Sequence, residues 1–196
     1  SLMVVMAIAG REATRQLAVF EIMEIRSLIG LVLLYPMLRA NGGLAATASR
    51  RLPLHLGRNA VHYGAQLGWF AALTMIPLSQ VVAIEFTMPI WTVLLAAAFL
   101  GERPNVRKVA AVVLGLVGVG LIVRPSPSGM NVGQLIALAA AVGFAMSVAM
   151  TKSLTGTEKP VTILFWMLAL QSLFGVVPAL LVWRWPSAYT WGWLVV

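Results

Sequence analysis

The sequence has 196 residues, of which 60% are hydrophobic and 10% charged, and it contains no cysteine. About one quarter of the residues in a soluble globular domain are charged, so this composition excludes that class and indicates a membrane protein that crosses the bilayer several times. The lack of cysteine excludes disulfides, thiolate metal sites and thiol catalysis. The formal net charge of +8 would suit nucleic acid, but the basic residues lie between apolar runs without interleaved aromatics. We therefore expect no nucleic-acid partner.

The apolar runs predict an all-α bundle of about seven to eight membrane spans. We expect residues 1–9 to be the end of a first helix, followed by a charged turn at 10–15. The second span ends at Tyr35-Pro36, and residues 39–58 form the longest loop. The later spans are separated by short turns that contain proline, glycine or lysine. The predicted spans after the first are 17–38, 59–76, about 20 residues within 77–104, 106–123, 132–150 and 161–183, with another run starting at 189.

The fourth span carries two residues that are costly inside a membrane, Glu85 and Pro89. Pro89 has no N–H to give the carbonyl of Glu85, four residues earlier. An ionisable side chain and a free backbone acceptor therefore fall at one depth, which requires a partner helix or a watery cavity. We expect Glu85 to face a cavity and Pro89 to act as a hinge.

The loop charges predict the orientation. If the first helix runs outward, most of the basic loop residues fall on one side, which the positive-inside rule makes cytoplasmic. The N-terminus is then cytoplasmic too. Tryptophans 183, 185, 191 and 193 flank span ends and suggest an aromatic belt. The richer side holds Arg39, Arg50, Arg51, Arg58, Arg103, Arg107, Lys108, Lys152 and Lys159, and the other side holds Arg11, Arg15, Arg124 and Arg184.

The chain also repeats itself weakly. RSLIGLVLL at 26–34 aligns with QSLFGVVPA at 171–179, and Phe20 aligns with Phe165. An offset of five spans makes the two copies inverted in the membrane, although chance similarity between apolar helices is the alternative. We expect a first repeat at 1–130 with an incomplete first helix, an incomplete second repeat at 131–196, and a parent protein of about ten helices.

Several motifs together resemble the EamA domain of the drug/metabolite transporter superfamily. They are the Pro77-Leu78-Ser79 turn, Thr87-Met88-Pro89-Ile90, Leu100-Gly101-Glu102-Arg103, the GLVGV run at 115–119, Arg124-Pro125, and Gly133-Gln134-Leu135 with the alanine-rich run to Ser147. This resemblance implies two inverted five-helix repeats around a central cavity. It also implies secondary transport of amino acids, nucleosides, other metabolites or drugs, with export favoured, in a bacterial inner membrane.

The third span offers the wall opposite Glu85. Asn59, His62, Tyr63, Gln66 and Phe70 recur at helical spacing and form a polar and aromatic stripe, as a cavity lining would. The alternative is that these groups only bind a neighbouring helix by hydrogen bonds. The residues that we expect to contact solute are Glu85, Gln66, Tyr63, Trp69, Trp91, Thr92 and His62.

Three charged residues of the second span need a separate account. Glu21 and Glu24 share a helix face and are expected at the cavity mouth. Arg26 lies two residues beyond Glu24, so it faces elsewhere and is expected to pair with a lipid headgroup or another helix.

These features predict a secondary transporter that works by alternating access, with Glu85 as a candidate proton carrier. Its partners would be a small-molecule solute, the lipid bilayer and protons, with no cofactor and no metal. Two alternatives stay open: a noncatalytic membrane subunit or sensor, and a membrane-embedded enzyme that uses Glu85 and His62. The sequence leaves the oligomeric state open, a homodimer included.

Overall fold

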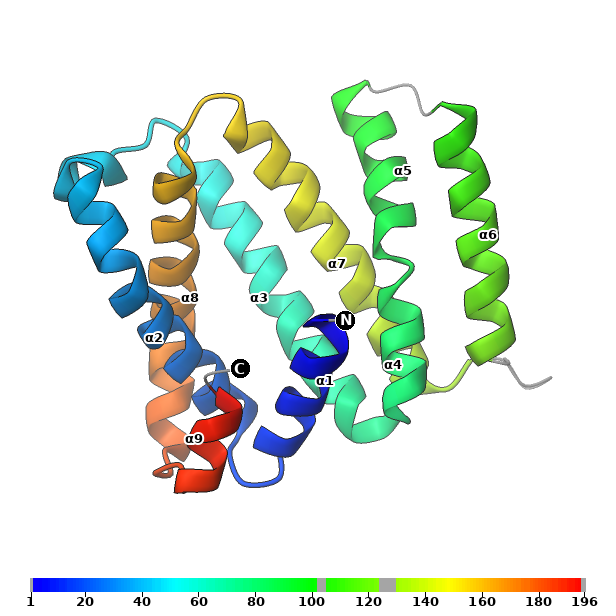
Figure 1. Ribbon diagram of the computed structural model, residues 1–196, viewed down its shortest axis with the longest axis horizontal. Helices are drawn as coiled ribbons and strands as arrows, with labels where there is room; N and C mark the ends of the chain where they lie inside the picture. Colours follow the sequence, from blue (N-terminus) through cyan, green and yellow to red (C-terminus); the bar gives the residue numbers. More distant parts are fainter. Residues whose placement is uncertain (1, 102–104, 124–129, 195–196) are drawn as a thin grey trace.

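The computed structural model describes residues 2–101, 105–123 and 130–194. The described residues fold as an all-α bundle, as predicted, with one 3₁₀ turn, η1 (Gly43–Thr47), between the second and third helices (Figure 1). Residues 102–104 and 124–129, which include Arg103, Arg124 and the predicted turn from Pro125 to Gly129, lie outside the described residues. The helices are α1 (Leu2–Ala13), α2 (Val19–Ala40), α3 (Leu52–Met75), α4 (Leu78–Glu85), α5 (Met88–Leu100), α6 (Val106–Val123), α7 (Val132–Thr155), α8 (Pro160–Val182) and α9 (Ala188–Leu194).

Several helix ends differ from the sequence prediction. α1 continues through Gly10, and α2 continues past Pro36 to Ala40, two residues beyond the predicted span of 17–38. α3 begins at Leu52 and not at residue 59, so Arg58 was wrongly assigned to a loop. The start of α3 follows from Pro53, because proline in the first helical turn loses no hydrogen bond and its φ suits the helix.

The predicted fourth span is one membrane-crossing segment that contains a helix break. α4 ends at Glu85 and α5 starts at Met88, so that Pro89 lies in the first turn of α5. Thr87 occupies the break and donates its hydroxyl to the carbonyl of Ile84 at 2.6 Å. The break therefore falls where proline removes the helical hydrogen bond, and the Ile84 carbonyl beside it accepts both the hydroxyl and the backbone N–H of Thr87.

Two helix pairs form the centre of the bundle. α3 packs along α7, and α2 packs along α8, while α5 lies against α7 and α6 lies at the edge (Figure 1). The main apolar core is shared by α1, α2, α3, α4, α7 and α9. α6 exposes Val113, Leu114, Val117 and Leu121, an apolar surface that suits contact with lipid tails.

The two helices that carry the aligned segments, α2 and α8, pack against each other. A Cβ on Gly30 would lie 2.7 Å from a methyl carbon of Leu168, and one on Gly175 would lie 2.9 Å from the Glu24 carboxylate. Such distances are too short for a real Cβ, so glycine permits the close approach on both helices. The division of the chain into two inverted repeats stays a prediction.

Within the described residues, three helical segments are long and apolar enough to cross a membrane: Leu78–Phe99, Val132–Thr155 and Pro160–Val182. α2 and α3, with 22 and 24 residues, are as long as these three segments. Their sequences are more polar because they include residues such as Glu24 and Asn59, whose side chains are buried inside the protein. Charged side chains inside a membrane protein normally face its interior or a cavity.

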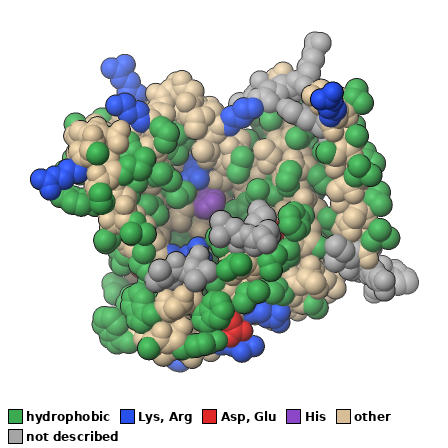
Figure 2. Space-filling model, viewed as in Figure 1, with side chains coloured by type: hydrophobic (Ala, Val, Ile, Leu, Met, Phe, Trp, Pro, Cys, Tyr) green, Lys and Arg blue, Asp and Glu red, His purple; other side chains and the backbone are tan. Residues whose placement is uncertain are grey.

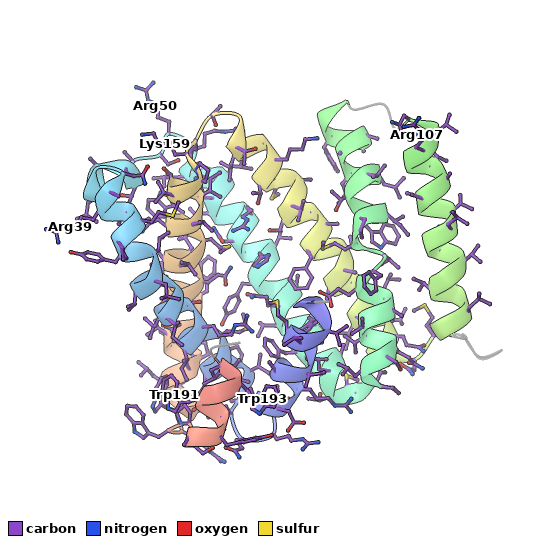
Figure 3. The ribbon with its side chains drawn as sticks, in the orientation of Figure 1. Arg39, Arg50, Arg107, Lys159, Trp191 and Trp193 are labelled. Atoms are coloured by element: carbon purple, nitrogen blue, oxygen red, sulfur yellow. The ribbon has the colours of Figure 1, made fainter. Side chains whose placement is uncertain are left out.

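Basic residues gather at one end of the bundle. Arg39, Arg50, Arg107 and Lys159 lie at this end, whereas Trp191 and Trp193 lie toward the opposite end (Figure 3). The loop that leads into α3 is attached here to the segment between α7 and α8. We call this attachment the loop clamp; its residues are Ser49, Arg51, His55, Ser153 and Glu158.

The loop clamp is densely hydrogen bonded. His55 Nε2 lies 2.6 Å from Glu158 Oε2, and Ser49 donates to the other carboxylate oxygen. Arg51 donates to the Ser153 carbonyl at 2.7 Å and to its hydroxyl at 3.0 Å. Burial alone would raise the pKa of Glu158, but the hydrogen bonds from Ser49 and His55 and the charges of His55 and Arg51 outweigh it. The pKa of Glu158 is therefore held below its ordinary value.

Candidate functional site

A cavity of about 420 Å³ lies in the middle of the bundle. This volume is within the range of small-molecule sites, roughly 300–1,000 Å³. Figure 2 shows a hollow in the middle of this face with a histidine side chain at its bottom, next to side chains of Lys or Arg. The lining comes from seven of the described helices: Met6 of α1; Met23, Arg26 and Ser27 of α2; Arg58, His62, Gln66, Trp69 and Phe70 of α3; Phe144, Ser147 and Val148 of α7; Met167, Leu168 and Gln171 of α8; and Glu85 of α4 with Met88 of α5 at the α4–α5 break.

α3 supplies the polar and aromatic side of the cavity. Arg58, His62, Gln66 and Trp69 follow one another at intervals of four, four and three residues, so they lie on one helix face. The structure thus places His62, Gln66 and Trp69, all expected to contact solute, on one wall. It adds Arg58 to that wall, since the true start of α3 brings this residue into the helix.

The helix break supplies the carboxylate. Glu85 is the last residue of α4, and its Oε2 accepts a hydrogen bond from Trp69 Nε1 at 3.1 Å. Trp69 also packs edge-on against Phe70, with ring centroids 5.1 Å apart. The break therefore places one acidic group directly beside the aromatic surface of the cavity.

Three polar atoms on the cavity lining are buried and have no hydrogen-bond partner among the described residues: Gln66 Oε1, His62 Nδ1 and Ser147 Oγ. Burying a polar atom without a partner costs free energy, so native proteins rarely leave such atoms unpaired. Three of them around one cavity suit a site that offers hydrogen bonds to water or to a solute.

The cavity also holds two guanidinium groups. Arg58 is only 6% exposed; its Nε donates to the Thr151 hydroxyl at 3.1 Å and its Nη1 to the Asn59 side-chain oxygen at 3.0 Å. Arg26 is half-buried and makes no hydrogen bond or ion pair within the described part of the chain. The lining thus carries two arginines and a single carboxylate, Glu85.

Three predicted solute contacts lie outside this lining. Trp91 donates its indole N–H to the Thr87 hydroxyl at 3.0 Å, and Thr92 donates to the Met88 carbonyl at 2.9 Å. Tyr63 is buried between α3 and α8, where its ring meets Phe174 edge-on at 5.9 Å. None of these three side chains is part of the lining of the central cavity in the described structure.

Glu21 and Glu24, expected at the cavity mouth, lie in two different places. Glu21 lines an open cleft beside residues 180–184, and its carboxylate accepts the backbone N–H groups of Ala18 and Arg184. Glu24 is buried in the α2–α8 contact and accepts a hydrogen bond from Ser172. Neither side chain lines the central cavity.

Sequence reasoning assigned Arg26 and Arg58 to other roles and gave Ser147, Phe144 and Gln171 no role in the site. Pro53 was the available signal for Arg58, because it marks the start of α3 and so extends the polar stripe by one turn. Ser147 and Phe144 lie in an apolar, alanine-rich helix. Nothing local distinguishes them from packing residues, and only the position of α7 against α3 brings them to the cavity.

Comparison with known proteins gives consistent relatives. A riboflavin transporter of Brucella anthropi is 35% identical over 142 residues, which are 72% of this chain and 50% of the relative. An S-adenosylmethionine uptake transporter of Rickettsia prowazekii is 24% identical, over 87% of this chain and 58% of the relative. A pseudopaline exporter of Pseudomonas aeruginosa is 28% identical, over 85% and 58%. The chain spans about half the length of the curated relatives it matches.

A solved crystal structure has the same fold, with a TM-score of 0.74 over 98% of this chain and 69% of its own, at 21% sequence identity. The sequence pattern of the EamA-like transporter family matches residues 2–124, which include the α4–α5 break and the α3 wall. The composition, the helical bundle and the relatives agree that this is a membrane protein of the drug/metabolite transporter superfamily, as the motifs suggested. The chain belongs to the EamA-like transporter family.

Proposed function

We propose that this protein is a secondary transporter that moves a small organic solute by alternating access around the central cavity. The observation that carries this proposal is the cavity itself, which is the size of a metabolite and carries unpartnered Gln66, His62 and Ser147. Relatives that are named as transporters of riboflavin, S-adenosylmethionine and pseudopaline support it. These compounds are the first solutes to test.

The α4–α5 break would provide the movement. Thr87 links the two helices without a continuous backbone ladder, and Pro89 prevents the ladder from closing. Hinges are short segments that absorb changes in φ and ψ, often at the ends of elements. Rotation at this break would move Glu85, the last residue of α4, relative to Trp69.

Glu85 would couple transport to protons. Its carboxylate lies in a membrane-spanning segment on the cavity lining, where an ionisable group is a functional candidate by default. Ionised Glu85 can only accept hydrogen bonds, from Trp69 and from a solute. Protonation removes its charge and turns one acceptor oxygen into an O–H donor, so solute and proton would compete for the same side chain.

The basic end of the bundle would face the cytoplasm of a bacterium, with the protein in the inner membrane. Arg39, Arg50, Arg107 and Lys159 lie at this end (Figure 3), and cytoplasmic loops are rich in Lys and Arg. The loop clamp then lies on the cytoplasmic side of the cavity.

Transport by the full-length protein in liposomes with an imposed pH gradient tests the proposal. We expect flux of at least one of the three solutes, and we expect Glu85→Gln to remove the dependence on the gradient. Glu12→Gln is the matched control, because Glu12 is partly exposed, pairs with Arg15 at 3.2 Å and is outside the cavity. If Glu85→Gln keeps the same pH dependence at the same protein level, the coupling role is wrong.

The direction of flux is read in the same experiment from vesicles loaded on either side. A protein that is folded, produces no flux of any solute and copurifies with another chain would instead be a membrane subunit or sensor.

A further inference from the structure

Arg26 is the cavity residue that neither the fold nor alternating access explains. It lies eight residues into α2, about 10 Å from the helix start at 1.5 Å per residue. Its side chain lines the central cavity and has no hydrogen bond or ion pair among the described residues. A guanidinium inside a membrane bundle is costly when nothing pairs with it, so its place on a cavity lining calls for a negative partner.

The other charges of the cavity do not provide that partner. The single carboxylate on the lining, Glu85, accepts the Trp69 indole N–H, and no ion pair joins it to Arg26 within the described residues. Glu24 is two residues from Arg26 on another helix face, and its carboxylate is turned to Ser172 and to the region of Gly175. Arg58 adds a second positive charge to the same cavity. The described lining therefore has an excess of positive charge.

The rest of the lining suits the body of an organic molecule. Trp69, Phe70 and Phe144 offer ring surfaces, and planar or apolar solutes pack well against aromatic side chains. Met6, Met23, Met88 and Met167 add flexible thioethers that adapt to irregular shapes. Gln66 and Ser147 supply hydrogen bonds that a neutral substituent can use.

We propose that the central cavity binds an organic anion, a solute with a carboxylate or phosphate group that pairs with the free guanidinium of Arg26 while its body packs against the aromatic side of α3. The proposal rests on the proposed transport function and specifies the class of its substrate. Arginine matches this chemistry because its fork of N–H groups fits two oxygens of a carboxylate or phosphate at once.

Matched pairs of compounds test the acidic group separately from the rest of the solute. Riboflavin 5′-phosphate against riboflavin and nicotinate against nicotinamide are the first two pairs in a panel of acids and their neutral counterparts. Binding is measured as stabilisation of the purified full-length protein against heat, which increases with the ratio of ligand concentration to Kd. We expect at least one acid to bind about tenfold or more tightly than its neutral counterpart, since a charge-assisted hydrogen bond is worth at least that ratio.

The Arg26→Gln variant should bind the acid and its neutral counterpart equally. Arg26→Lys should keep part of the preference for the acid, because it retains the charge and loses the fork. Arg39→Gln is the matched control: Arg39 lies on the same helix, is exposed and is near the basic end (Figure 3). It should keep the full preference. A correctly folded Arg26→Gln protein is identified by an unchanged unfolding temperature without ligand or by binding of a neutral solute.

Three outcomes would overturn the proposal. The first is a panel in which no acid binds better than its neutral counterpart. The second is a preference for acids that survives Arg26→Gln. The third is a preference for acids that is present in nanodiscs of phosphatidylcholine alone and disappears when phosphatidylglycerol is added. That result would assign the anion site to a lipid headgroup. Flux of a neutral solute with any of these results would leave the proposed transport function intact, so the two failures can be told apart.

Discussion

The loop clamp and the central cavity both use polar side chains of α3 and α7, and they differ in how these groups are paired. In the clamp, His55, Arg51 and Glu158 are joined to one another or to neighbours within short distances, although His55 Nδ1 has no partner in the described residues. On the cavity lining, Gln66 Oε1, His62 Nδ1 and Ser147 Oγ all lack one. Paired buried groups stabilise the fold, whereas unpaired ones reduce stability and are available to a ligand.

The largest expected effect comes from breaking the clamp. Glu158→Gln removes the charge that His55, fully buried, and Ser49 bind. Loss of one partner of a buried pair leaves the other uncompensated, so we expect a loss of about 3 kcal/mol in the free energy of unfolding. Chemical unfolding in detergent measures it. A loss no greater than that of the control Glu12→Gln, which removes a partly exposed carboxylate outside the clamp, would show that the clamp does not hold the bundle together.

A second test asks whether the α2–α8 contact is as rigid as the clamp. The methyl group of Gly175→Ala would lie 2.9 Å from Glu24 Oε2 and 3.3 Å from the Tyr63 hydroxyl. Overpacking of a tight contact costs about 2 kcal/mol. The same exchange at Gly118 in α6, where a Cβ meets nothing within 4 Å, should be neutral or stabilising. Equal unfolding temperatures for the two variants would mean that the contact gives way easily.

The substitution of glutamine by leucine can be made at a glutamine with hydrogen-bond partners and at one whose side-chain oxygen has none among the described residues. Gln134 accepts the Asn131 backbone N–H at 3.0 Å and donates to Gln80 at 3.1 Å, so Gln134→Leu should cost about 1 kcal/mol. Gln66 has an unpartnered oxygen on the cavity lining, so Gln66→Leu should leave the free energy of unfolding almost unchanged and weaken solute binding. If Gln66→Leu costs as much as Gln134→Leu, Gln66 has a structural role.

The smallest effect concerns acid, which weakens the clamp without removing a side chain. The pKa of Glu158 is held below its ordinary value of 4.5, so the unfolded chain binds its proton first as pH falls. The stability that Glu158 contributes is therefore complete above the ordinary pKa of 4.5 and is lost as the pH falls through the lower pKa of the folded protein. Unfolding at a series of pH values from about 6 to about 3 should show a steeper loss in the wild type than in Glu158→Gln. Parallel curves would contradict the assignment.

Local sequence patterns were sufficient for the helices and for part of the cavity. The apolar runs predicted α6 within its observed bounds and α8 to within one residue at each end, because length and hydropathy alone decide what crosses a bilayer. Spacing on one helix placed His62, Gln66 and Phe70 in one stripe, since a helix repeats every 3.6 residues, and all three line the cavity. Proline chemistry indicated a free carbonyl at Glu85 and a hinge at Pro89, and the structure adds that the helix breaks between these two residues.

Which face meets which neighbour was decided only by the tertiary structure. Tyr63 shares α3 with Gln66 but lies against α8, and Glu24 shares α2 with Arg26 but is buried in the α2–α8 contact, where Gly175 permits the approach. Arg26 and Ser147 reach the cavity through the packing of α2 on α8 and of α3 on α7. The sequence determined the helices and their polar faces because these follow from local spacing. The partners of each face depend on contacts between residues far apart in the chain, which no local pattern contains.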